Sequence, residues 1–145
     1  MVRKAEAKDT EEVLGLIKEF HKESINAYDV LCDDTIARQV IGKFLDTSFV
    51  LELDNKVVGV FGGMITNYPL NNKRVYLEWI WYVLPKYRLH GIGLYNKVIE
   101  YCKENDVEQI IMVLMANLKT DKLDKFYKRL GFELLEKHYI KNLGA

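Results

Sequence analysis

The sequence has few of the features that mark metal-binding, secreted or membrane proteins. Its two cysteines lie far apart, and neither they nor the three histidines show the spacing of metal ligands. No apolar stretch reaches membrane-spanning length, and the N-terminus does not resemble a signal peptide. We therefore expect a cytoplasmic protein with no metal site and no membrane partner.

The sequence also lacks net charge and low-complexity stretches. Its 21 basic and 21 acidic residues cancel, so no overall field attracts nucleic acid, and no nucleic-acid partner is expected. Hydrophobic residues make up 49% of the 145 residues, which is sufficient for a packed core. These properties predict one domain over residues 1–145.

Hydrophobic periodicity predicts strands and helices in the order β-α-α-β-β-β-α-β-α-β. The expected strands are Met1 to Ala5, Ser48 to Leu53, Lys56 to Ile65, Arg74 to Val83, Gln109 to Met115 and Phe132 to Ile140. The expected helices begin at Asp9, where Glu12 completes a capping box, at Asp33, at Leu94 and at Thr120. Gly62 and Gly63 indicate a bulge or a close backbone approach. The order predicts an α/β fold around one mixed sheet.

A basic, glycine-spaced turn separates the strand that ends at Val83 from the helix that begins at Leu94. A helix N-terminus carries unpaired N–H groups and a positive dipole, which suit a diphosphate. Gly91 and Gly93 let the backbone approach phosphate oxygens, and Arg88 adds a cation with forked donors. This segment therefore predicts a phosphate-binding turn.

Two motifs resemble those of the GNAT superfamily, the acetyl-CoA-dependent N-acetyltransferases. The string Val-x-Pro-x-Tyr-Arg-x-x-Gly-Ile-Gly from Val83 to Gly93 resembles motif A, and Phe126 to Phe132 resembles the Phe/Leu-Tyr-x-x-x-Gly-Phe motif. The resemblance implies a GNAT-like fold, with a mixed and mostly antiparallel sheet flanked by about four helices. It also implies that acetyl-CoA lies between the fourth and fifth strands, which splay apart.

The resemblance further implies which residues bind acetyl-CoA. They are Tyr82, Val83, Leu84, Arg88, Leu89, His90, Gly91, Ile92, Gly93 and Leu94. A backbone N–H at the strand end would polarise the thioester carbonyl. Leu89 stands where glycine is common. His90 is either a weak phosphate contact or a solvent-facing turn residue. Asn117 is expected on the pantetheine amide, although it stands ten residues before Tyr127 where seven is usual; otherwise it is a loop or capping residue.

Glu78 is the candidate general base. Side chains alternate along a strand, which places Glu78 opposite the apolar face that holds Trp79 and Trp81. Burial makes a carboxylate costly and raises its pKa. Many members of the family carry an acidic residue here, where it would deprotonate the incoming ammonium. The alternative is a structural carboxylate that pairs with Arg74 or Lys73, or one that is solvated.

Tyr127 is the candidate general acid. It matches a tyrosine that, in many members of the family, faces the cofactor sulfur and protonates the leaving thiolate. A phenol with a pKa of ~10 can donate to a thiolate. The alternative is a core tyrosine on the same helix face as Leu123.

The resemblance thus implies an N-acetyltransferase that moves acetyl from acetyl-CoA to a primary amine of a small molecule or protein. No cysteine lies in either motif, which favours direct transfer in a ternary complex over an acetyl-enzyme. Homodimers are frequent in the family, and the sheet edges allow one. The alternative function is a non-catalytic acyl-CoA-binding or interaction module on the same fold.

Overall fold

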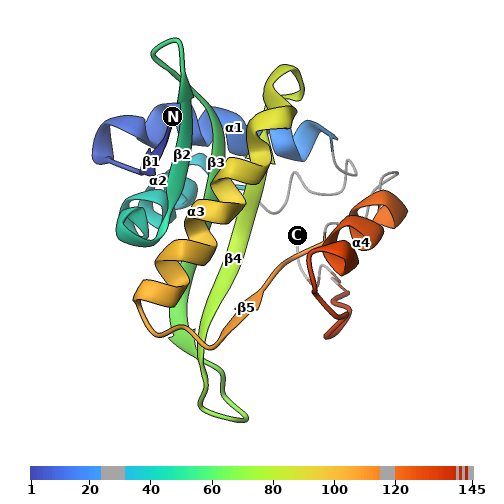
Figure 1. The fold of residues 1–145 in the computed structure, drawn as a ribbon. Helices are drawn as coiled ribbons and strands as arrows, with labels where there is room; N and C mark the ends of the chain where they lie inside the picture. Colours follow the sequence, from blue (N-terminus) through green and yellow to red (C-terminus); the bar gives the residue numbers. More distant parts are fainter. Residues whose placement is uncertain (24–31, 115–119, 140, 142, 144–145) are drawn as a thin grey trace.

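The computed structural model describes residues 1–23, 32–114, 120–139, 141 and 143 (Figure 1). The strands are β1 (Val2–Lys4), β2 (Phe49–Leu53), β3 (Lys56–Asn67), β4 (Arg74–Val83) and β5 (Gln109–Ile111). The helices are α1 (Thr10–Glu23), α2 (Asp34–Lys43), α3 (Gly91–Glu104) and α4 (Thr120–Arg129). Short 3₁₀ helices lie at Ala7–Asp9, Leu45–Thr47 and Pro85–His90.

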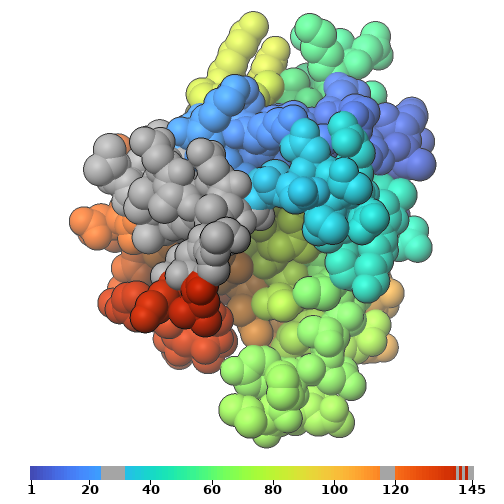
Figure 2. Space-filling view, turned by 180° about the vertical axis from the view of Figure 1, so that it is seen from behind, coloured from blue at the N-terminus to red at the C-terminus, as the bar shows by residue number. Residues whose placement is uncertain are grey.

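The strands form one mixed sheet in the order β1-β2-β3-β4-β5. The first four strands pair antiparallel, and β5 pairs parallel to β4. Apolar side chains of α1 and α2 pack on one face of the sheet, and those of α3 pack on the other. Figure 2 shows the first of these faces, with α1 (blue) and α2 (cyan) above the β3–β4 hairpin (light green). The predicted mixed, mostly antiparallel α/β fold is confirmed.

The last predicted strand, Phe132 to Ile140, is wrong for the residues that the structure describes. Residues 132–139 form no strand, and Leu134, Leu135 and Tyr139 are largely exposed. A strand needs a paired neighbour and a buried face, and β5, the edge strand, is only three residues long. The segment therefore has little sheet to join.

The predicted capping box at the start of α1 is also wrong. The Asp9 carboxylate accepts two hydrogen bonds from the Arg3 guanidinium, at 2.8 and 2.9 Å, and it is 2% exposed. The Glu12 carboxylate accepts from the N–H of Val57 at 2.9 Å. Oδ2 of Asp9 also accepts from the N–H of Glu6 at 2.8 Å, so Asp9 forms a capping box with Glu6 on the preceding 3₁₀ helix and not with Glu12. The contacts with Arg3 and Val57 connect the two side chains to the sheet.

A bulge interrupts β4. Gly62 lies opposite Ile80 whereas Gly63 lies opposite Glu78, so Trp79 is the extra residue. An ideal Cβ on Gly62 would lie 2.6 Å from Cζ2 of Trp79, which shows how closely the indole approaches the backbone. The bulge or close approach that the two glycines predicted is therefore confirmed.

The bulge reverses the side-chain alternation along β4. Trp79 packs with the α1 and α2 core, whereas Tyr76 and Trp81 both belong to the α3 core. Glu78 stands two residues after Tyr76 and therefore lies on the same side as Trp81. The expectation that Glu78 lies opposite Trp81 is wrong, because that expectation assumed an uninterrupted strand.

We expect Gly63→Ala to lower the free energy of unfolding by about 1–3 kcal/mol, the usual cost of overpacking a core. An added Cβ would lie 2.5 Å from Cζ of Tyr76, whose ring is fully buried and whose hydroxyl donates to the carbonyl of Thr47 at 2.6 Å. Urea unfolding would measure the change. Gly15→Ala is the control, because nothing lies within 4 Å of its Cβ and it should gain about 0.5–1 kcal/mol. Equal stability of Gly63→Ala and wild type would contradict the packing described here.

Candidate active site

β4 and β5 diverge at the centre of the molecule. Their pairing covers Val75 to Leu77 on β4 and Gln109 to Ile111 on β5, and β4 then continues to Val83 without a β5 partner. Figure 1 shows the chain after β5 (orange) leaving β4 and running toward α4. We call the unpaired residues 78–83 of β4, together with residues 112–114 after β5, the β4–β5 gap. This divergence agrees with the splayed strands that the family resemblance implies.

The predicted strand-end residues are Tyr82, Val83 and Leu84. The backbone N–H and C=O of one of them face this gap. The N–H of Leu84 donates to the carbonyl of Val58 on β3 at 2.9 Å, so that group is already occupied. Because backbone groups alternate in direction, Tyr82 also faces β3, and Val83 faces the open side. Val83 is therefore the strand-end residue that can offer backbone groups to a ligand.

Glu78 lies in the gap as a buried carboxyl group. It is 4% exposed, and its Oε2 accepts from the N–H of Val113 at 2.7 Å. Burial raises the pKa of Glu78 to about 8, against the opposing effect of that hydrogen bond. Within the described part of the chain no cation pairs with it, and the Arg74 guanidinium donates instead to the carbonyl of Asn105 at 2.9 Å. Glu78 is thus neither solvated nor paired with Arg74.

Tyr127 reaches the same residue from α4. Its hydroxyl donates to the carbonyl of Val113 at 3.3 Å, and burial raises its pKa above the ordinary phenol value. Its ring stacks on Trp81 with 6.4 Å between centroids and 6° between planes. The structure therefore brings the candidate base, Glu78, and the candidate acid, Tyr127, to the N–H and the carbonyl of one residue. No sequence signal marks Val113, because both contacts use its backbone.

The phosphate turn (Arg88 to Leu94) is more helical than expected. The 3₁₀ helix Pro85–His90 runs directly into α3, which begins at Gly91 and not at Leu94. The N–H of Gly91 already donates to the carbonyl of Arg88, and its missing Cβ faces Val83 at 3.4 Å. That distance is an ordinary contact, so the packing of α3 on the strand end does not require a glycine here, and Gly91 does not itself offer a free N–H.

The exposed part of this turn is formed by four side chains. Leu89 and Ile92 are 95% and 42% exposed, Arg88 and His90 are exposed as well, and Leu94 is fully buried. His90 is the N-cap of α3 but makes no side-chain cap hydrogen bond. An exposed helix start with a cation beside it is consistent with the predicted anion site. Asn117, the remaining predicted contact, lies outside the described residues.

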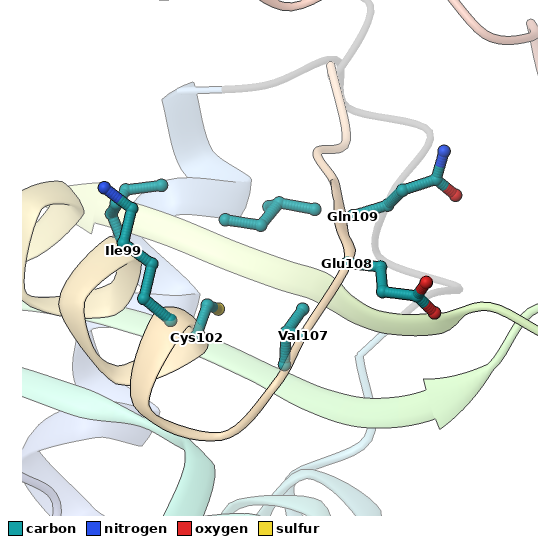
Figure 3. Close-up of a pocket in the computed structure, with 7 residues that line it drawn as sticks. Ile99, Cys102, Val107, Glu108 and Gln109 are labelled. Atoms are coloured by element: carbon teal, nitrogen blue, oxygen red, sulfur yellow. The ribbon is translucent and has the colours of Figure 1, made fainter.

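Two hollows lie elsewhere on the molecule. One, of about 150 Å³, lies between the C-terminal end of α3 and the start of β5 (Figure 3). Ile99, Cys102 and Val107 line it, while Glu108 and Gln109 point outward. Burial raises the pKa of Cys102 to about 11, so the thiol stays protonated near neutral pH.

The other hollow, of about 170 Å³, lies between α1, α2 and Trp79 of β4. Ile17, Ile36 and Val40 contribute to its lining, so it is largely apolar. It lies on the α1 and α2 side of the sheet, opposite the face of Glu78 and Trp81.

The described residues contain no group of three or more His, Cys, Asp or Glu side chains arranged to hold a metal ion. They also contain no helix with the length and apolar character needed to cross a membrane.

Comparison with solved structures shows the fold. A ribosomal-protein-alanine N-acetyltransferase from Brucella melitensis biovar Abortus 2308 has 16% identity, 99% coverage of each chain and a TM-score of 0.73. A predicted acetyltransferase with acetyl-CoA from Clostridium acetobutylicum has 20% identity, a TM-score of 0.73, and coverage of 98% of this chain and 95% of that one. Aminoglycoside N-acetyltransferase AAC(6')-Iy in complex with CoA has 17% identity, a TM-score of 0.75, and coverage of 100% and 95%. All three are acetyltransferases by description.

Comparison of the sequence with curated proteins finds no match. The sequence does match the profile of the Acetyltransferase (GNAT) family over residues 9–132, which is most of the chain. This range includes β4, the phosphate turn, Glu78 and Tyr127. The chain therefore belongs to the acetyltransferase (GNAT) family of enzymes.

Proposed function

We propose that this protein transfers an acetyl group from acetyl-CoA to a primary amine by direct attack in a ternary complex. The observation that carries the proposal is the meeting of Glu78 and Tyr127 at Val113, inside the β4–β5 gap. One is a buried carboxyl group and the other a partly buried phenol, so the gap holds a candidate base and a candidate acid. Such a pair is what amine acylation by a thioester requires.

Glu78 removes a proton from the acceptor ammonium, directly or through water, because only the neutral amine is nucleophilic. The amine nitrogen then bonds to the thioester carbonyl carbon, the C–S bond breaks, and the nitrogen releases its extra proton to solvent as the amide forms. Tyr127 donates its hydroxyl proton to the departing thiolate and regains a proton from solvent. The N–H of Val83, which faces the gap, hydrogen-bonds the thioester oxygen and stabilises the charge that develops there.

The residues at the start of α3 suit the diphosphate of acetyl-CoA. Arg88 is exposed beside a helix N-terminus that has no side-chain cap, and Ile92 lies on the exposed side of the first turn. Two of the similar structures contain acetyl-CoA or CoA by description. When bound, acetyl-CoA supplies the activated acetyl group.

Neither cysteine supports a covalent acetyl-enzyme. Cys102 lies at the far end of α3 from the phosphate turn, and burial raises the pKa of both thiols above the ordinary value. A thiol nucleophile needs the opposite shift. We therefore favour direct transfer. The acceptors named for similar proteins, a ribosomal-protein alanine and aminoglycosides, are both amines, and we propose an acceptor of that class.

The test is a calorimetric titration of the purified protein with acetyl-CoA, beside Ile92→Glu and its neutral control Ile92→Gln. We expect saturable binding by wild type and by Ile92→Gln. Ile92→Glu places an anion at the helix start and should weaken binding about tenfold, which corresponds to ~1.4 kcal/mol of repulsion at close range. A folded wild-type protein that does not bind acetyl-CoA would contradict the proposed function. Equal affinities of Ile92→Glu and Ile92→Gln for acetyl-CoA would show that the diphosphate does not bind at this turn.

A further inference from the structure

Glu23, the last residue of α1, accepts hydrogen bonds from two residues that are predicted to contact acetyl-CoA. Its Oε2 accepts from Nη2 of Arg88 at 2.6 Å, and its Oε1 accepts from the hydroxyl of Tyr82 at 2.9 Å. Burial, reinforced by the bond to Glu23, raises the pKa of Tyr82 to about 12, so the hydroxyl remains a donor at neutral pH. One carboxylate therefore joins the end of α1, β4 and the phosphate turn.

The other groups that the Arg88 guanidinium contacts also lie away from the start of α3. Its Nε donates to the carbonyl of Val83 at 3.2 Å, and its Cζ lies 5.7 Å from the centre of the Tyr82 ring. Among the described residues, the partners of the guanidinium thus belong to α1 and β4. The Val83 carbonyl is one of the groups that faces the β4–β5 gap. Arg88 covers it in this arrangement.

Arg88 can exchange Glu23 for another anion at little cost in stability. Their side chains are 38% and 40% exposed, and an ion pair of that exposure contributes little to stability. A diphosphate carries more negative charge than a carboxylate and offers several oxygens to the same fork of N–H donors. A bidentate contact needs two N–H groups on one edge of the guanidinium, and on the Nε–Nη2 edge both nitrogens already donate, to the Val83 carbonyl and to Glu23. The two anions therefore compete for one guanidinium.

We propose that Glu23 competes with the diphosphate of acetyl-CoA for Arg88, so that Arg88 leaves Glu23 and the Val83 carbonyl when acetyl-CoA binds. This inference rests on the proposed function. In this structure the contact covers both the cation of the phosphate turn and a backbone carbonyl of the gap. Binding of acetyl-CoA uncovers the carbonyl and releases the Glu23 carboxylate at the end of α1. Glu23 is thereby assigned as a positioning residue that sets the affinity for acetyl-CoA.

A double-mutant cycle measured with CoA, which binds without turnover, tests this competition. Calorimetry would give the dissociation constants of wild type, Glu23→Gln, Arg88→Ala and the double variant. We expect Glu23→Gln to tighten CoA binding about two- to fivefold, the range that an exposed ion pair controls. Arg88→Ala should weaken binding about tenfold. In the Arg88→Ala background, the Glu23→Gln change should have no further effect.

Glu19→Gln is the matched control, because Glu19 is an exposed carboxylate on the same helix, paired with Lys22 at 3.0 Å. It should leave CoA binding unchanged. A gain from Glu23→Gln that persists in Arg88→Ala would reveal only a general charge effect and would overturn the inference. Unchanged or weaker binding by Glu23→Gln would overturn it as well, while leaving the proposed function intact. A failure of folded wild type to bind CoA is a separate result, which contradicts the proposed function itself.

Discussion

Glu78→Gln is expected to lower kcat by about 10²- to 10⁴-fold, the usual contribution of a positioned general base. The amide keeps an oxygen that can accept the N–H of Val113, which Glu78 now accepts at 2.7 Å, so the gap should retain its shape. It cannot take a proton from the acceptor ammonium. The dissociation constant of acetyl-CoA should stay within about twofold of wild type, because the amide preserves the shape of the gap and the phosphate turn is unchanged.

The experiment combines steady-state release of free CoA thiol with calorimetry of acetyl-CoA binding. Glu104→Gln is the matched control, because Glu104 is an exposed carboxylate at the end of α3. Its turnover should equal that of wild type. If Glu78→Gln retained wild-type turnover, the carboxyl group would be structural, and the alternative of a binding module would gain support.

Tyr127→Phe is expected to lower kcat by about 10²-fold or more, within the range of a general acid. The phenyl ring can keep the stack on Trp81 and the contact with Phe132, whose centroid lies 5.9 Å away. Only the hydroxyl is lost, so α4 and the affinity for acetyl-CoA should be preserved. The thiolate then leaves without a proton from Tyr127.

Tyr139→Phe serves as the control, since Tyr139 is 92% exposed and makes none of these contacts. Stopped-flow measurement of thiol release would separate the chemical step from product release. Wild-type rates in Tyr127→Phe would show that this residue is a core aromatic whose hydroxyl has no part in the reaction.

The sequence predicted much of the fold because its signals are local. The boundaries of β4 follow from an apolar run that ends before a proline, and α4 begins at Thr120 as its apolar face indicated. The pair Gly62 and Gly63 predicted a bulge. The effect of the bulge on β4 was not predictable, because the register between β3 and β4 decides which strand contains the extra residue. That residue is Trp79. That single residue moves Glu78 to the side of Trp81.

Other features depend on contacts between distant segments. The segment 132–139 has the composition of a strand, but a strand forms only where an edge can pair with it, and β5 is too short. Val113 has no distinguishing side-chain chemistry, yet its backbone joins Glu78 and Tyr127. The contact of Glu23 with Arg88 connects residues far apart in sequence, so no motif marks it.

We propose the buried carboxyl group of Glu78 as the base in acetyl transfer. Its pKa is raised to about 8 by burial, so most of the free enzyme holds it protonated at pH 7. Since the base works only when ionised, kcat/KM should rise with pH and level off above about 8. The acceptor amine also gains reactivity with pH, and Glu78→Gln separates the two contributions.

The most direct measurement is therefore the pH dependence of kcat/KM between pH 6 and pH 10 for wild type and Glu78→Gln, with one primary amine acceptor and free thiol as the readout. The mechanism proposed above predicts an inflection near pH 8 in wild type that Glu78→Gln lacks. The same profile in both proteins, differing only in scale or not at all, would contradict the assignment of Glu78 as the base.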